Sequence, residues 1–96
     1  MGEDERVVPV FFLSDSTGIS AETMGNALLL QFPDRTFERS TIPFIAGVEQ
    51  AREIAAMLDE VAAGPVMPLV FSTAADDDVR HELNRTVAPV IDFFDM

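Results

Sequence analysis

Eight residues with hydroxyl, carboxylate or unhindered backbone groups form two clusters along the chain. The first cluster follows the apolar segment 7–13, and it comprises Ser14, Asp15, Ser16, Thr17, Gly18 and Ser20. The second cluster, Ser72 and Thr73, ends another apolar segment. Short hydroxyl side chains and the backbone amides at the start of a helix can donate hydrogen bonds to a phosphate-like anion. The two clusters together are therefore a candidate phosphate or anion site.

The same residue types also have a purely structural explanation. Ser, Thr and Asp are the common N-caps of helices, and a junction between a strand and a helix needs a polar loop. A glycine such as Gly18 permits a turn conformation that other residues avoid. From the residues alone, an anion site and a merely capped turn are equally good interpretations of residues 14–18.

Seven elements are predicted to position these clusters. Mostly apolar segments predict strands at residues 7–13, 67–72 and 89–94, and a mixed segment that ends at Pro43 predicts a strand at 36–42. Helical periodicity predicts helices at 20–32, 48–63 and 77–86. This alternation is typical of a parallel sheet with helices on both faces. We expect a disordered tail at residues 1–6 and then, over 7–96, one three-layer Rossmann-like α/β domain with strand order 2-1-3-4. That order brings both clusters to one crevice at the carboxyl edge of the sheet.

Several finer predictions concern single positions. Met24, Leu28 and Phe32 share one side of the first helix, which favours a stripe facing the core. Thr73 could cap the third helix, and the strand at 36–42 should be an edge strand with one wet face. Pro9 would cost a ladder hydrogen bond in a central strand, so either the first strand begins near Val10 or its first half borders an open edge.

Composition excludes several classes of function. The net charge is −11, from 17 acidic residues and six basic ones that are all Arg, and this balance argues against nucleic-acid binding. The chain has no Lys for a Walker loop and no Cys for a thiol nucleophile or a thiolate metal site. Consecutive aspartates at residues 76–78 point in different directions on a helix, so we expect no metal site there. With no apolar run long enough for a membrane span and no secretory signal, we expect a cytoplasmic protein.

Known phosphate chemistries on this architecture fit poorly. A receiver domain needs an acidic pair after the first strand, an Asp after the third and a downstream Lys, whereas this chain has only Asp15, then Ser72 and Thr73, and no Lys. The loop also lacks the Gly-x-Gly-x-x-Gly of a dinucleotide site and the Gly-x-Ser-x-Gly of a nucleophile elbow. We therefore assign no catalytic residue from motifs.

The amino-acid sequence resembles that of one protein family. Residues 11–23, Phe-Phe-Leu-Ser-Asp-Ser-Thr-Gly-Ile-Ser-Ala-Glu-Thr, are similar to the opening motif of the bacterial and plant regulatory proteins of phosphoenolpyruvate synthase and pyruvate, phosphate dikinase. Shorter collinear similarities occur at residues 31–33, 37–39, 42–44 and 70–73, so the resemblance covers about residues 7–94. It implies a bifunctional serine/threonine kinase and phosphorylase. Such an enzyme uses ADP to phosphorylate a threonine of its target, and it uses inorganic phosphate to remove that group and release pyrophosphate.

The resemblance also implies what this chain contributes. In the family the nucleotide-binding loop, which contains a Lys, lies in a second, C-terminal domain, and neither that loop nor any Lys is present here. We therefore expect the N-terminal domain of a longer protein, inactive alone, with ADP and phosphate as ligands of the parent. The expected partners are phosphoenolpyruvate synthase or pyruvate, phosphate dikinase and a second copy of the chain. The alternative is a non-catalytic binding or dimerisation module in which residues 14–18 are only a capped turn.

Overall fold

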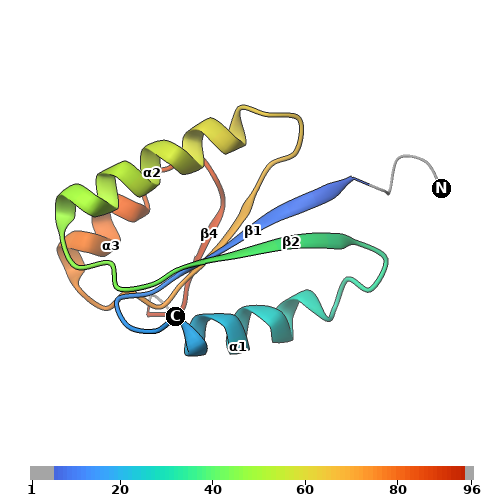
Figure 1. The fold of residues 1–96 in the computed structure, drawn as a ribbon, viewed down its shortest axis with the longest axis horizontal. Helices are drawn as coiled ribbons and strands as arrows, with labels where there is room; N and C mark the ends of the chain where they lie inside the picture. Colours follow the sequence, from blue (N-terminus) through green and yellow to red (C-terminus); the bar gives the residue numbers. More distant parts are fainter. Residues whose placement is uncertain (1–5, 95–96) are drawn as a thin grey trace.

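A four-stranded parallel sheet lies between two helical layers in the computed structural model, which describes residues 6–94 (Figure 1). The elements in chain order are β1 (Val7–Leu13), α1 (Ile19–Leu29), β2 (Thr36–Ile42), α2 (Val48–Ala62), β3 (Leu69–Ser72), α3 (Asp77–Leu83) and β4 (Val90–Asp92). The strand order is β2-β1-β3-β4, and each neighbouring pair is parallel. The predicted fold class and strand order are confirmed. The tail predicted at residues 1–6 lies, except for Arg6, outside the described residues.

The pairing of β1 explains how the sheet accepts Pro9. β1 pairs with β2 over its whole length, from Val7 opposite Thr36 to Leu13 opposite Ile42. It pairs with β3 only from Val10 onward, where Val10 lies opposite Leu69. The first half of β1 therefore borders an open edge, which is one of the two predicted ways to place a proline in this strand. β2 is an edge strand with mostly exposed residues, as predicted.

Some predicted boundaries are wrong by a few residues. α1 ends at Leu29 rather than at residue 32, because the amides of Gln31 and Phe32 bond to the carbonyls of Leu28 and Leu29 in tighter turns before Pro33. β3, β4 and α3 are also shorter than predicted. The predicted Thr73 cap of α3 is wrong. Asp76 caps this helix instead, and its carboxylate accepts the amides of Asp78 and Val79, both at 3.0 Å.

One face of the sheet packs against both α2 and α3, which lie together on that side (Figure 1). The buried core there takes residues from the strands, from both helices and from the loops between them. Its members are Leu13, Ile45, Ala51, Ile54, Leu58, Val70, Ala74, Val79, Leu83 and Ala88. This α2–α3 face is the larger core of the domain.

The opposite face is covered by α1 alone (Figure 1), and its buried core is Val10, Phe12, Ala21, Leu29 and Phe71. α1 lies close to the sheet at Gly25, where an added Cβ would come within 2.5 Å of the Phe12 ring and 2.9 Å of the Phe71 ring. The predicted core stripe of Met24, Leu28 and Phe32 is therefore wrong, since all three side chains are exposed. Ala21 and Gly25 on the other side of α1 are small and let the helix come closer to the sheet. That side, which also carries Leu29, therefore faces the sheet.

Candidate functional site

The loop after β1 is held by its own first serine. Ser14 is 1% exposed, and its hydroxyl oxygen accepts the Ser16 amide at 3.0 Å and lies 3.3 Å from the Ser16 hydroxyl. The loop after β2 fixes the other side, because the Phe44 amide donates to the Ser16 carbonyl at 2.9 Å and the Ile45 amide donates to the Ser14 carbonyl at 3.0 Å. Ser14 is therefore a positioning residue that fixes the direction of Ser16.

Gly18 starts α1 in a conformation that leaves the helix end open. Its φ of 95° is left-handed, and a Cβ there would lie 2.7 Å from the Thr41 methyl carbon. No side chain caps α1, and the first backbone bond of the helix runs from the Glu22 amide to the Gly18 carbonyl at 3.0 Å. The amides of residues 19–21 thus have no helical acceptor. Residues 14–18 are therefore not a capped turn in the sense of a hydroxyl bonded to the first turn of α1.

The second cluster is joined to the first by backbone and side-chain bonds. The Thr73 amide donates to the Leu13 carbonyl at 3.0 Å, and the Ala75 amide donates to Asp15 Oδ2 at 3.0 Å. Ser72 is 2% exposed, and its hydroxyl accepts the Ala74 amide at 3.3 Å. Asp15 therefore ties the loop after β1 to the loop after β3, as expected where neighbouring parallel strands end at the same edge.

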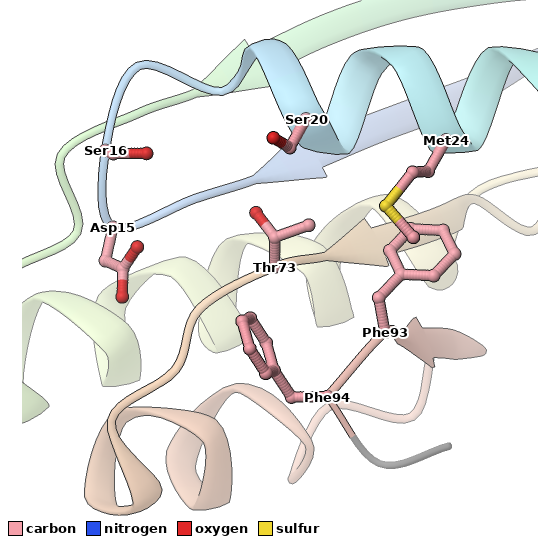
Figure 2. Close-up of a pocket in the computed structure, with 7 residues that line it drawn as sticks. All are labelled: Asp15, Ser16, Ser20, Met24, Thr73, Phe93 and Phe94. Carbon is pink, nitrogen blue, oxygen red and sulfur yellow. The ribbon is translucent and has the colours of Figure 1, made fainter.

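A crevice of about 400 Å³ lies between the start of α1 and the chain that follows β4 (Figure 2). Its lining residues are Asp15, Ser16, Ser20, Met24, Thr73, Phe93 and Phe94. Four of the predicted site residues are among them: Asp15, Ser16, Ser20 and Thr73. The other four do not line it: Ser14, Gly18 and Ser72 are buried in the turns beside the crevice, and Thr17 is exposed.

Sequence reasoning missed the apolar residues of this crevice. The sequence predicts Met24 in the core and places Phe93 and Phe94 only within the strand at residues 89–94. A usable signal was present, because β4 is parallel to β1 and β3 and the residues after it must reach the same sheet edge. The Phe93 amide donates to the Ser72 carbonyl at 3.0 Å. This bond holds the residues that follow β4 beside the end of β3, next to the crevice.

The electrostatics of the crevice are unusual for an anion site. Among the described residues that line it, Asp15 is the one with a charged side chain, and none is Arg. Within residues 6–94, no group of three His, Cys, Asp or Glu side chains is placed to hold a metal ion. Any anion here would therefore be bound by backbone amides, hydroxyl groups and the positive end of the α1 dipole.

Comparisons with known proteins point in the same direction as the resemblance. The kinase/pyrophosphorylase family matches residues 10–96. A protein of Alkalilimnicola ehrlichii named "Putative phosphoenolpyruvate synthase regulatory protein" is 44% identical over 87 residues, which are 90% of this chain and 31% of that protein. Proteins of the same name from Legionella pneumophila (strain Corby) and Aromatoleum aromaticum are 40% and 39% identical, over 88% and 96% of this chain and 32% and 34% of their own lengths. The chain thus spans about a third of the length of these relatives.

Proposed function

Since the chain belongs to the kinase/pyrophosphorylase family, we propose that it works as one domain of a protein that regulates phosphoenolpyruvate synthase or pyruvate, phosphate dikinase. In the proposed kinase reaction, a threonine hydroxyl of the target attacks the β-phosphate of ADP, giving phosphothreonine and AMP. In the proposed dephosphorylation, inorganic phosphate attacks the phosphothreonine, giving threonine and pyrophosphate. The names of the relatives support the target, and the proposed location is the cytoplasm. The described residues 6–94 include no helix that could cross a membrane.

The proposed role of this domain is to hold a phosphate group at the loop after β1. The observation that carries this role is the uncapped start of α1, whose first amides have no acceptor, next to the Ser16 and Ser20 hydroxyls. A phosphate oxygen placed there could accept hydrogen bonds from these hydroxyls and from the uncapped amides, and the α1 dipole would favour its charge. Ser14 would hold the loop in shape without touching the ligand.

The same geometry limits what the domain can do alone. No Lys or Arg lines the crevice, so nothing there can neutralise the charge that develops on a transferred phosphoryl group. We propose that ADP is bound and phosphoryl transfer occurs elsewhere in the whole protein. We therefore expect the 96-residue chain to show no phosphorylation of a dikinase above a no-enzyme control when ADP is supplied.

Thermal unfolding tests the phosphate site on the chain itself. Melting followed by circular dichroism should be compared in phosphate and in chloride at equal ionic strength, with sulfate as a control for general salt effects. Phosphate at ten times its dissociation constant adds about 1.4 kcal/mol to the free energy of unfolding, which is about 6–11 °C in a domain of this size.

Variants locate the effect of phosphate. Replacing Ser16 and Ser20 together with Ala should remove most of the phosphate-dependent shift, because both hydroxyls line the crevice. Thr17→Ala is the matched control, since Thr17 belongs to the same loop, is exposed and does not line the crevice. Equal stabilisation by phosphate in all three proteins would contradict the proposed site.

A second candidate function, a dimerisation module, is favoured by the outer surface of α1. Glu22 is the only charged residue of this helix, although the chain as a whole has a net charge of −11. Ile19, Met24 and Leu28 are exposed on it. Two copies of so acidic a chain would meet with little repulsion through this surface, which carries few charges. Both functions can belong to the same domain, because the phosphate site lies at the end of α1.

A further inference from the structure

The crevice has an apolar half that a phosphate group would not use. Asp15 and Ser16 lie at one end, Met24 and Phe93 lie at the other, and Thr73 and Phe94 lie between them (Figure 2). Its volume of about 400 Å³ is within the range of sites that enclose small ligands or a few side chains. A site of this character fits an occupant with an apolar part beside a polar or charged part.

The apolar half is held in place by the sheet. The Phe93 ring stacks on the Phe71 ring with centroids 6.0 Å apart, and Phe71 stacks in turn on Phe12 at 5.7 Å. The Phe94 amide donates to Asp92 Oδ1 at 2.9 Å, which fixes the turn after β4. Phe94 nevertheless remains 56% exposed. The apolar surface is therefore preformed and accessible from solvent.

The charge at the polar end of the crevice favours an occupant of opposite charge. Within residues 6–94, Asp15 is the one charged residue that lines the crevice, and its Oδ2 accepts the Ala75 amide at 3.0 Å. The exposed aspartates at residues 76–78 directly follow Ala75 in the sequence. The whole chain carries a net charge of −11. A cationic side chain is therefore attracted to Asp15.

From this combination we infer that the crevice docks a short segment of a partner protein in which an apolar side chain is next to an Arg or Lys. The apolar side chain would pack on Met24, Phe93 and Phe94, and the basic side chain would pair with Asp15. The inference rests on the proposed function in one respect, that the domain acts on a protein. It goes further by naming the chemistry of the segment that is recognised.

Titration calorimetry with short peptides tests the inference on the chain as it exists. The probe is the acetylated and amidated tetrapeptide Gly-Leu-Arg-Gly at low salt, and the comparison peptides are Gly-Leu-Glu-Gly and Gly-Gly-Arg-Gly. We expect measurable, salt-sensitive binding of the first peptide and much weaker binding of the other two. Binding of the Glu peptide as tight as that of the Arg peptide would overturn the inference, as would no binding of any peptide.

Two pairs of variants test where the peptide binds. Asp15→Asn keeps an oxygen acceptor for the Ala75 amide but removes the charge, and we expect binding to weaken about two- to fivefold, as for an exposed ion pair. Asp34→Asn removes an exposed carboxylate that does not line the crevice, and it should change affinity little. Phe94→Ala should weaken binding, whereas Phe32→Ala should not, although both rings are 56% exposed.

The outcomes separate this inference from the phosphate site. If Asp15→Asn and Phe94→Ala melt like the original protein yet bind the peptide equally well, the docking inference is wrong. Peptide binding without phosphate-dependent stabilisation supports the docking inference and contradicts the phosphate site. Phosphate-dependent stabilisation without peptide binding overturns the docking inference and leaves the phosphate site standing.

Discussion

The two faces of the sheet are covered in different ways. On one face, α2 and α3 bury a continuous core around Leu58, Val70 and Leu83. The other face is covered by α1 alone (Figure 1), which packs over Phe12 and Phe71. The neighbouring Ile91 and Phe93 are only partly buried. The α2–α3 face has the features of a structural core, whereas the α1 face leaves apolar surface available for a ligand or partner.

Polar contacts show the same difference. Arg52 on α2 pairs with the buried Glu82 on α3 at 3.4 Å, and Asp59 on α2 accepts the Thr86 hydroxyl at 2.6 Å. α1 is tied to β2, where Thr41 donates to Glu22 and Arg39 donates to Asn26. Among the described residues, the polar side-chain contacts of α1 are on this β2 side. The side of α1 toward β4 is left open, and the crevice lies there.

Truncating one leucine on each face should give the largest difference between them. Leu58 is fully buried on the α2–α3 face and Leu28 is 39% exposed on α1. We expect Leu58→Ala to reduce the free energy of unfolding by about 2–5 kcal/mol, and Leu28→Ala to reduce it by less than about 1 kcal/mol because little apolar area is lost. Urea unfolding would measure both. Equal losses would mean that α1 is packed as a core helix.

Adding a methyl group at Gly25 should test how closely α1 lies on its face. The new carbon would meet the rings of Phe12 and Phe71 at less than 3.0 Å, so we expect Gly25→Ala to destabilise the domain by about 1–3 kcal/mol. Gly47→Ala is the control, since no atom lies within 4 Å of an added Cβ there and its φ is −152°. Unchanged stability of Gly25→Ala would show that α1 can move away from the sheet without cost.

The sequence predicted the sheet correctly but not how α1 covers one of its faces. The parallel sheet, its strand order and the bounds of β1 and β2 followed from the alternation of strand-like segments with helical periodicity. The orientation of α1 did not, because Met24, Leu28 and Phe32 have the same four-residue spacing as Ala21, Gly25 and Leu29. The close approach of Gly25 to two aromatic rings decides between them, and that contact depends on the packed sheet.

The candidate site was predictable where it depends on strand ends. Asp15, Ser16, Ser20 and Thr73 were expected at one edge, and the structure brings them together. Ser14 and Ser72 have the same residue type but are buried, because each accepts a backbone amide within its own turn. Residue type alone cannot separate a hydroxyl that builds a turn from one that faces a ligand.

Introducing a charge on the outer surface of α1 should test the proposed role of this helix in self-association. We expect the chain to shift from monomer toward dimer as salt rises to about 0.5 M, where the Debye length falls to a few ångströms. Met24→Asp should keep it monomeric, while Met67→Asp should not, since the two methionines are 42% and 49% exposed on different parts of the surface. Sedimentation velocity with interference optics would show this, because the chain has no Trp or Tyr. A monomer at every salt concentration would contradict a dimerisation surface on α1.

The smallest expected effect is a change in acid sensitivity on the α2–α3 face. The Thr86 hydroxyl, followed by the Val87 amide, lowers the pKa of Asp59 below its ordinary value of 3.8, against a small opposing effect of desolvation. Its contribution to stability is therefore complete above pH 3.8 and is lost as the pH falls through the lower pKa of the folded state. Thr86→Val should flatten the loss of stability in that range, as measured by urea unfolding at stepped pH. An unchanged acid slope would mean that this contact has no part in acid unfolding.

The central claim is that the open edge beside α1 is the ligand site of this domain. Amide NMR shifts of the isotope-labelled chain during a phosphate titration test this claim most directly. We predict saturable shifts at the amides of residues 19–21 and at Ser16 and Thr73, with the amides of α2 and α3 unchanged. Shifts confined to α2 and α3, or no saturable shift at the start of α1, would contradict the claim.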